Sequence, residues 1–237
     1  MRSLIKLIAI LLLLSPLNGW AHGYWIEVEG NHKIKETVTV KLFFGEYVSG
    51  ERLAGNYLDR MKDIRIYVSA PGSSKQPIVM KQLDGYWEGT FIPEKEGSYE
   101  VSGINDEREV QDWTKHNLGI VRPIQYLKTV YQAGNTKTSS VHPAFLDVKL
   151  EATGKNKYEV TLVKNDSAFA YAKITVTHPA GWEKILSADK DGKATFTSVG
   201  PALYLVSVEW IDKTPGKFKD KPYETVRHQL DFSLYNE

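Results

Sequence analysis

The residues of this chain that could carry chemistry are its histidines and a few carboxylates. The sequence contains six histidines and no cysteine, so disulfides, thiolate metal ligands and cysteine nucleophiles are excluded. Three positions favour metal binding: His22, Glu46 and His228. The other four histidines lie in turns, in a charged stretch or directly before a proline, where a structural role explains them; they are His32, His116, His142 and His178.

His22 is a candidate metal ligand because of the segment that precedes it. Residues 1–21 have the pattern of a secretory signal peptide, with basic residues, a short apolar run, and the small residues Gly19 and Ala21 before the expected cleavage site. Cleavage after Ala21 would leave His22 with a free α-amine beside its ring. Those nitrogens could close a chelate ring on nickel or copper, which nitrogen ligands favour over calcium or magnesium. The alternative is that a histidine stands first by chance.

Two further residues could complete such a site. His228 has the same parity as Leu230 and Phe232, which places it on the inward face of the expected last strand. An inward histidine at a strand end is either a satisfied core group or a ligand, and both roles stay open. Glu46 follows Gly45 directly after an apolar strand, where site residues are common. A solvated turn carboxylate is the alternative for Glu46.

Motifs of other chemistries are absent or incomplete. The sequence has no Gly-x-Ser-x-Gly, no phosphate-binding Walker loop and no Gly-x-Gly-x-x-Gly. Residues 189–192 match part of a calcium loop, but the distal glutamate is missing and Asp-Gly between two strands indicates a hairpin. The carboxylates of residues 106–112 are typical of a solvated surface. A glycosidase would need two carboxylates facing each other across a cleft.

Charge and hydropathy exclude several kinds of partner. Thirty Lys and Arg residues nearly balance 29 Asp and Glu residues, which argues against nucleic acid or an anionic membrane surface. After residue 21, no apolar run approaches the roughly 20 residues that a membrane span needs. A secreted chain without cysteine is more typical of bacteria than of the eukaryotic secretory pathway. We therefore expect a soluble periplasmic protein.

The elements that must position these residues are β-strands. Apolar residues alternate with polar ones in segments such as 38–44, 158–162 and 230–234, as in half-buried strands. Glycine and proline turn signals separate these segments, and long helical periods are missing. The expected fold class is all-β.

A small, polar segment at residues 132–142 predicts a linker between two domains. The N-terminal domain would cover residues 22–131, and the C-terminal domain residues 143–237. Each has the length and strand count of an immunoglobulin-like or transthyretin-like β-sandwich. One continuous sandwich with a decorated loop is the alternative.

Five segments spread over the chain carry a family resemblance: Ala21-His22-Gly23-Tyr24-Trp25-Ile26-Glu27, residues 38–46, Tyr126-Leu127-Lys128 before Gly134, residues 188–196, and Arg227-His228-Gln229-Leu230-Asp231-Phe232. Together they resemble the NikM-like periplasmic components of ABC-type cobalt/nickel uptake systems, a family often described only as a domain of unknown function. Ala188 stands where that family usually has threonine.

The resemblance implies a non-enzymatic periplasmic protein with two β-sandwich domains, the second similar to Cna-B or carboxypeptidase-regulatory modules. It implies a bound divalent transition metal, nickel or cobalt with copper as a further candidate, and a membrane transporter component as partner. Of the family's functional positions, His22, Glu46 and His228 carry over.

A second resemblance concerns the segment Ala21-His22-Gly23-Tyr24, which is similar to the start of mature lytic polysaccharide monooxygenases. Those copper enzymes hold their metal with an N-terminal histidine and a second histidine. Their usual Ser/Pro-rich, cysteine-containing continuation is missing here. A carbohydrate-binding or adhesive sandwich with an incidental histidine is a third possibility, and metal carriage is the leading expectation.

Overall fold

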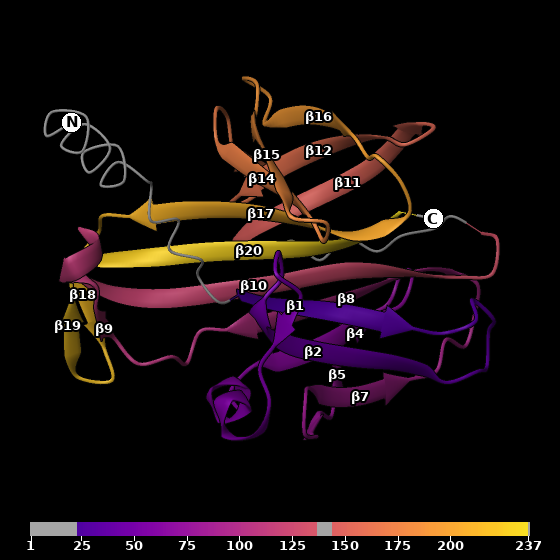
Figure 1. Cartoon of the computed structure of the whole chain (residues 1–237), viewed down its shortest axis with the longest axis horizontal. Coiled ribbons are helices and arrows are strands. Elements are labelled where there is room, and N and C mark those ends of the chain that lie inside the picture. Colours follow the sequence, from indigo (N-terminus) through magenta and orange to yellow (C-terminus); the bar gives the residue numbers. More distant parts are fainter. Residues whose placement is uncertain (1–22, 137–143, 237) are drawn as a thin grey trace, which may run out of the picture.

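The protein is built almost entirely from β-strands, which confirms the all-β prediction. The structure is a computed structural model that describes residues 23–136 and 144–236 (Figure 1). Within these ranges, helical backbone is limited to two short 3-10 elements, η1 (Gly55–Met61) and η2 (Thr114–His116). In the same ranges, no helix combines the length and the apolar character needed to cross a membrane.

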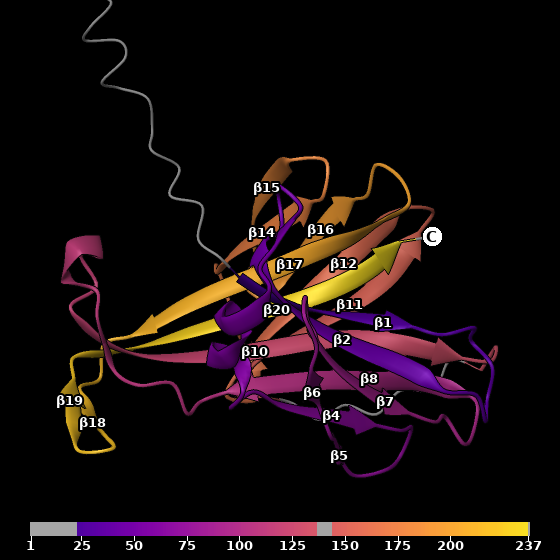
Figure 2. The ribbon, with the colours of Figure 1, turned by 60° about the horizontal axis from the view of Figure 1, so that its bottom comes forward.

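A nine-stranded sheet, here called the central sheet, runs through the whole molecule in the order β15-β14-β17-β20-β10-β8-β4-β5, with β9 paired to β10. Its strands are β4 (Arg65–Ser69), β5 (Gln76–Ile78), β8 (Gly97–Asn105), β9 (Gln111–Asp112), β10 (Ile120–Ala133), β14 (Lys173–His178), β15 (Trp182–Ser187), β17 (Ala202–Asp212) and β20 (Thr225–Asn236). Figure 2 shows β10 and β20 lying side by side. They pair in parallel, with Ile124 opposite His228, so both halves of the sequence share one sheet.

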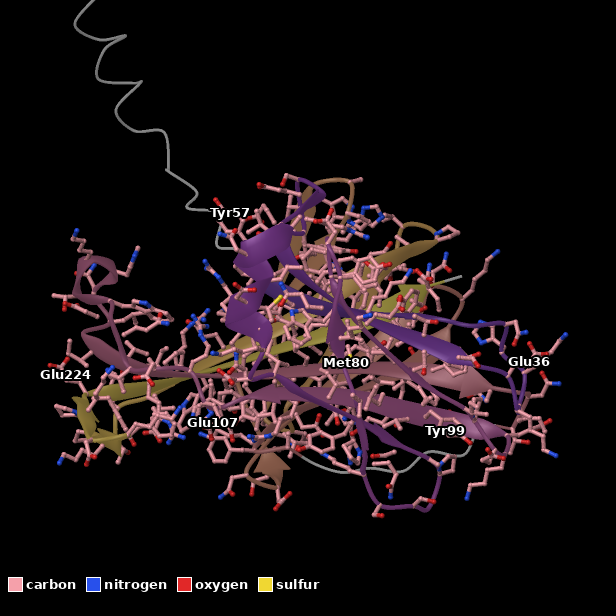
Figure 3. All side chains as sticks on the ribbon, turned by 90° about the horizontal axis from the view of Figure 1, so that it is seen from below. Glu36, Tyr57, Met80, Tyr99, Glu107 and Glu224 are labelled. Atoms are coloured by element: carbon pink, nitrogen blue, oxygen red, sulfur yellow. The ribbon has the colours of Figure 1, made fainter. Side chains whose placement is uncertain are left out.

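Two smaller sheets cover the central sheet from opposite sides (Figure 1). The N-terminal sheet consists of β1 (Gly23–Glu29), β2 (Val38–Glu46), β3 (Glu51–Arg52), β6 (Lys81–Gln82) and β7 (Trp87–Phe91). The C-terminal sheet consists of β11 (Leu146–Gly154), β12 (Lys157–Lys164), β13 (Ser167–Ala168) and β16 (Lys193–Thr197). A separate hairpin of β18 (Gly216–Phe218) and β19 (Lys221–Tyr223) lies with β9 and η2 at one end of the molecule. Figure 3 places Glu224 at that end and Glu36 at the other.

Alternation along the central strands produces two hydrophobic cores. Leu127 and Tyr131 of β10 pack with Val40 of the N-terminal sheet in the first core. Tyr126, their neighbour on β10, packs with Val160 of the C-terminal sheet in the second core. Successive side chains of a strand point to opposite faces, so β10 supplies both cores. Full burial of a valine or leucine side chain contributes about 1.5–3 kcal/mol to folding, which explains why these apolar runs become central strands.

The predicted linker at residues 132–142 lies partly outside the described residues. β10 continues through Gln132 and Ala133, so the strand extends two residues beyond the predicted end of the first domain. Residues 137–143 are outside the described ranges. The central sheet contains strands from both sides of this segment. The division into domains of residues 22–131 and 143–237 stays a prediction.

Candidate functional site

Glu46 is the last residue of β2 and lies at the end of the N-terminal sheet where the described chain begins. β1 and β2 are antiparallel, and Gly23, the first residue of β1, lies opposite Gly45. A Cβ atom on Gly45 would come within 2.1 Å of the carbonyl oxygen of Glu51. The glycine before Glu46 therefore permits the close approach of β3.

Aromatic side chains fix this end of β2 against the central sheet. Trp25 stacks on Phe43 with ring centroids 5.5 Å apart, and both pack on Leu205 of β17. Tyr47, the residue after β2, meets Trp25 edge-on at 5.3 Å and donates a hydrogen bond to the carbonyl oxygen of Leu203. Burial raises the pKa of Tyr47 above its usual range. The end of β2 is thus held by contacts from two layers.

A second carboxylate near this end is already committed to structural contacts. Glu27 Oε1 accepts hydrogen bonds from Arg52 Nη2 at 2.7 Å and from Trp25 Nε1 at 2.8 Å. The guanidinium carbon of Arg52 also lies 4.0 Å from the ring centroid of Phe43. Glu27 is therefore a charge-paired residue. Glu46, the half-buried last residue of β2, is the other carboxylate at this end.

His228 of β20 lies in a different environment, among the aromatic side chains of Tyr126, Phe145 and Trp210. Its ring centroid is 4.7 Å from that of Phe145 and 5.2 Å from that of Trp210. Its Nδ1 lies 3.0 Å from the hydroxyl oxygen of Tyr126, and the residue is only 7% exposed. Burial lowers the pKa of His228 to about 4, although the carboxylate of Asp212 acts in the opposite direction. The ring is therefore neutral at neutral pH.

The alternation of β20 separates His228 from Glu46. The side chain of His228 shares its face with Leu230, which packs in the core under the C-terminal sheet. β1 lies over the opposite face, where the backbone nitrogen of Val28 donates to the Tyr235 hydroxyl at 2.7 Å. The expectation that His22, Glu46 and His228 contribute to one metal site stays a prediction, with His228 on the face of the central sheet opposite to β1.

The third predicted ligand, His22, lies outside the described residues. Among residues 23–136 and 144–236, no group of three or more His, Cys, Asp or Glu side chains is placed to hold a metal ion. Two of the other histidines pack on aromatic rings, His32 on Tyr131 and His178 on Trp182. Metal binding by His22, Glu46 and His228 stays a prediction.

Three buried charges form a cluster that the sequence reasoning missed. Lys128 Nζ lies 2.9 Å from Glu100 Oε2 and 2.8 Å from Asp147 Oδ1, so it links β10 to β8 and to β11 of the C-terminal sheet. All three residues are buried, and they line a cavity of about 230 Å³. The available signal was Lys128 itself, a charged residue directly after Leu127 in the expected strand.

A third buried carboxylate was also missed. Asp231 of β20 accepts hydrogen bonds from Ser207 Oγ at 2.6 Å, from Gln125 Nε2 at 2.7 Å and from Gln229 Nε2 at 3.1 Å. Burial raises the pKa of this carboxyl above its ordinary value, while the hydrogen bonds act in the opposite direction. Both carboxylate oxygens of Asp231 accept hydrogen bonds in this network, which links β10, β17 and β20.

Comparison with known proteins places the chain in a family whose function is not described. Among solved structures, the D0-D1 domain of intimin is similar over 90% of this chain and 99% of its own, with 14% sequence identity and a TM-score of 0.24, an overlap too weak to indicate a role. No curated protein matches the sequence. The family model described as "Domain of unknown function (DUF4198)" matches residues 19–212. Because that match covers well over half of the 237 residues, the protein belongs to the DUF4198 family.

Proposed function

We propose that this protein is a periplasmic carrier of a divalent transition metal, exported by a signal peptide at residues 1–21. Its cargo would be nickel or cobalt, with copper as a further candidate, and it would pass the ion to a membrane transporter component. The proposal extends the resemblance to NikM-like periplasmic proteins, and it assigns no catalytic role.

One observation supports this proposal most directly. Gly23 lies opposite Gly45 in the pairing of β1 with β2, and Glu46 is the next residue of β2. The described chain therefore begins at the end of the sheet that carries Glu46, and consecutive Cα atoms are about 3.8 Å apart. A histidine at the mature N-terminus would therefore begin close to a half-buried carboxylate.

The donor set that we propose contains two nitrogens from His22, the α-amine and an imidazole nitrogen, and an oxygen from Glu46. Nitrogen donors favour nickel and copper over magnesium and calcium, and copper has the higher intrinsic affinity. The amine must be neutral to bind, and its reference pKa is about 7.7–8.0. Affinity should therefore fall as the pH drops below neutral. His228 is not part of this donor set.

The test uses protein exported with its own signal segment, with the N-terminus verified by mass spectrometry. Nickel, cobalt and copper are titrated by calorimetry into this protein and into a variant with one glycine added before His22. We expect the added glycine to weaken binding at least tenfold, because it removes the α-amine from the chelate ring.

Matched variants test the carboxylate separately. Glu46→Gln should weaken binding, whereas Glu29→Gln, at the other end of β1, should not, because Glu29 instead pairs with Lys41 at 2.7 Å. His228→Gln should also bind with unchanged affinity. If the glycine-extended protein binds every metal as tightly as the processed protein, the proposed site is wrong.

A further inference from the structure

The cavity beside Lys128 has the features of a second binding site, independent of the proposed metal site. It lies where the central sheet meets the start of β11, and its volume is about 230 Å³. A water molecule occupies roughly 30 Å³ in the liquid, so this space suits a small organic molecule. Its charged wall consists of Glu100, Lys128 and Asp147.

The charged wall carries an uncompensated negative charge. Two carboxylates, from Glu100 and Asp147, share the single ammonium of Lys128 at 2.9 and 2.8 Å. The side chains of all three are less than a tenth exposed, so solvent screens the excess charge poorly. Lys75 also lines the cavity, but it is an exposed residue outside the strands. Its charge is therefore screened more strongly than the buried ones.

One carboxylate oxygen on this wall is free to accept a hydrogen bond. Asp147 Oδ1 accepts from Lys128 Nζ and from the backbone nitrogen of Val148, each at 2.8 Å. Asp147 Oδ2 is buried and has no hydrogen-bond partner among the described residues. Ser102 lies directly opposite Lys128 in the pairing of β8 with β10. Its Oγ is also buried and has no hydrogen-bond partner among the described residues. A buried carboxylate oxygen without a donor is costly, so a donor that reaches Asp147 from the cavity would be stabilised.

The remaining walls are aromatic and aliphatic. Tyr67, Tyr126 and Phe145 supply aromatic rings, and Ile104 and Leu230 supply aliphatic surface. Faces of aromatic rings attract cations as well as apolar groups. Pockets for small molecules typically combine such apolar walls with a few placed polar groups.

We propose that this cavity binds a small organic ammonium compound, an amine with an apolar body. Its ammonium group donates to Asp147 Oδ2 and balances the excess carboxylate charge, while its body packs against Tyr126 and Phe145. A neutral molecule of the same shape gains the apolar contacts alone, and a carboxylate is repelled. The site therefore recognises charge as well as shape.

The experiment compares three probes of similar shape on the full processed protein: 2-phenylethylammonium, 2-phenylethanol and 3-phenylpropionate. Binding is measured by calorimetry and by chemical-shift changes in the NMR spectrum. We expect one equivalent of the ammonium probe to bind at least tenfold more tightly than the alcohol, with shifts at Lys128 and Phe145, and no binding of the carboxylate.

Variants separate charge recognition from a loss of folding. Asp147→Asn should abolish the preference for the ammonium probe, but it also breaks a buried ion pair. Lys75→Glu leaves that pair intact and adds negative charge at the rim, so it should tighten ammonium binding about threefold at low salt without affecting the alcohol. Lys173→Glu is the matched control, because this exposed lysine of β14 makes the same charge change and does not line the cavity.

Three results would count against the proposal. Equal affinities for the ammonium and alcohol probes would show an apolar cavity that ignores charge. Failure of the ammonium probe to bind at millimolar concentration would show that the charge cluster only joins the two sheets. A response of Lys173→Glu equal to that of Lys75→Glu would also count against it, because the charge effect would then be nonspecific.

Discussion

The buried ring of His228 predicts how the stability of this protein depends on pH. In the unfolded chain the pKa of a histidine is about 6.5, whereas burial lowers that of His228 to about 4 in the folded protein. Arg122 and Lys164 lower it further, and Asp212 partly opposes them. A depressed pKa means that the folded state favours the neutral ring, so its contribution to stability is complete above pH 6.5. That contribution is lost as the pH falls toward 4.

The magnitude follows from the difference between the two pKa values. Each unit corresponds to about 1.4 kcal/mol, and between pH 7.5 and pH 4.5 most of the difference is realised. After a discount for partial solvent screening, we expect His228 to account for about 2 kcal/mol of stability lost over this interval. The ring cannot avoid this cost by a small movement, because Phe145 and Trp210 pack against it.

The assay is urea unfolding of the wild type and of His228→Gln at both pH values, followed by circular dichroism. Glutamine keeps a polar side chain but does not titrate, so the variant should lose about 2 kcal/mol less than the wild type between pH 7.5 and 4.5. The absolute stability of the variant at pH 7.5 does not matter, because only the pH-dependent difference is compared. Equal losses in the two proteins would refute the assignment of His228 as a buried neutral ring.

Two further substitutions test packing and buried charge. Gly45→Ala should lower the free energy of unfolding by about 1–3 kcal/mol, because its Cβ would meet the Glu51 carbonyl oxygen at 2.1 Å; an unchanged denaturation midpoint would contradict this. Lys128→Met should cost about 3–5 kcal/mol at pH 7 by stranding two buried carboxylates. Urea unfolding at pH 7 measures this cost, and a free energy of unfolding equal to that of the wild type would contradict it.

Much of the local structure was predictable from the sequence. Val38, Val40 and Leu42 alternate with polar residues, and all three are buried on one face of β2. A turn at Asp191 and Gly192 does lie between β15 and β16, but these strands belong to different sheets, so the hairpin that the sequence indicates there is wrong. These features depend on a strand's period of two and on turn chemistry, both of which act between near neighbours in the chain.

The candidate sites were less predictable, because they depend on contacts between distant segments. The parity of His228 correctly placed it on an inward face, but parity does not say which core lies on that face. The sequence also placed Lys128 in a strand without indicating that Glu100 and Asp147 would approach it from two other strands. Glu46 was recognised only through its glycine neighbour.

The sequence by itself determined an all-β chain, its strand positions and the side of each strand that is buried, because alternation and turn residues are local properties. Only the tertiary structure decided that β10 and β20 pair in parallel within one sheet. That pairing gives the sheet a core on each face, and His228 faces the core on the side away from β1. Glu46 instead lies at the end of β2, next to the residue that pairs with Gly23. The physical reason is that strand pairing satisfies backbone hydrogen bonds between segments about a hundred residues apart, and no local pattern encodes which segments will meet.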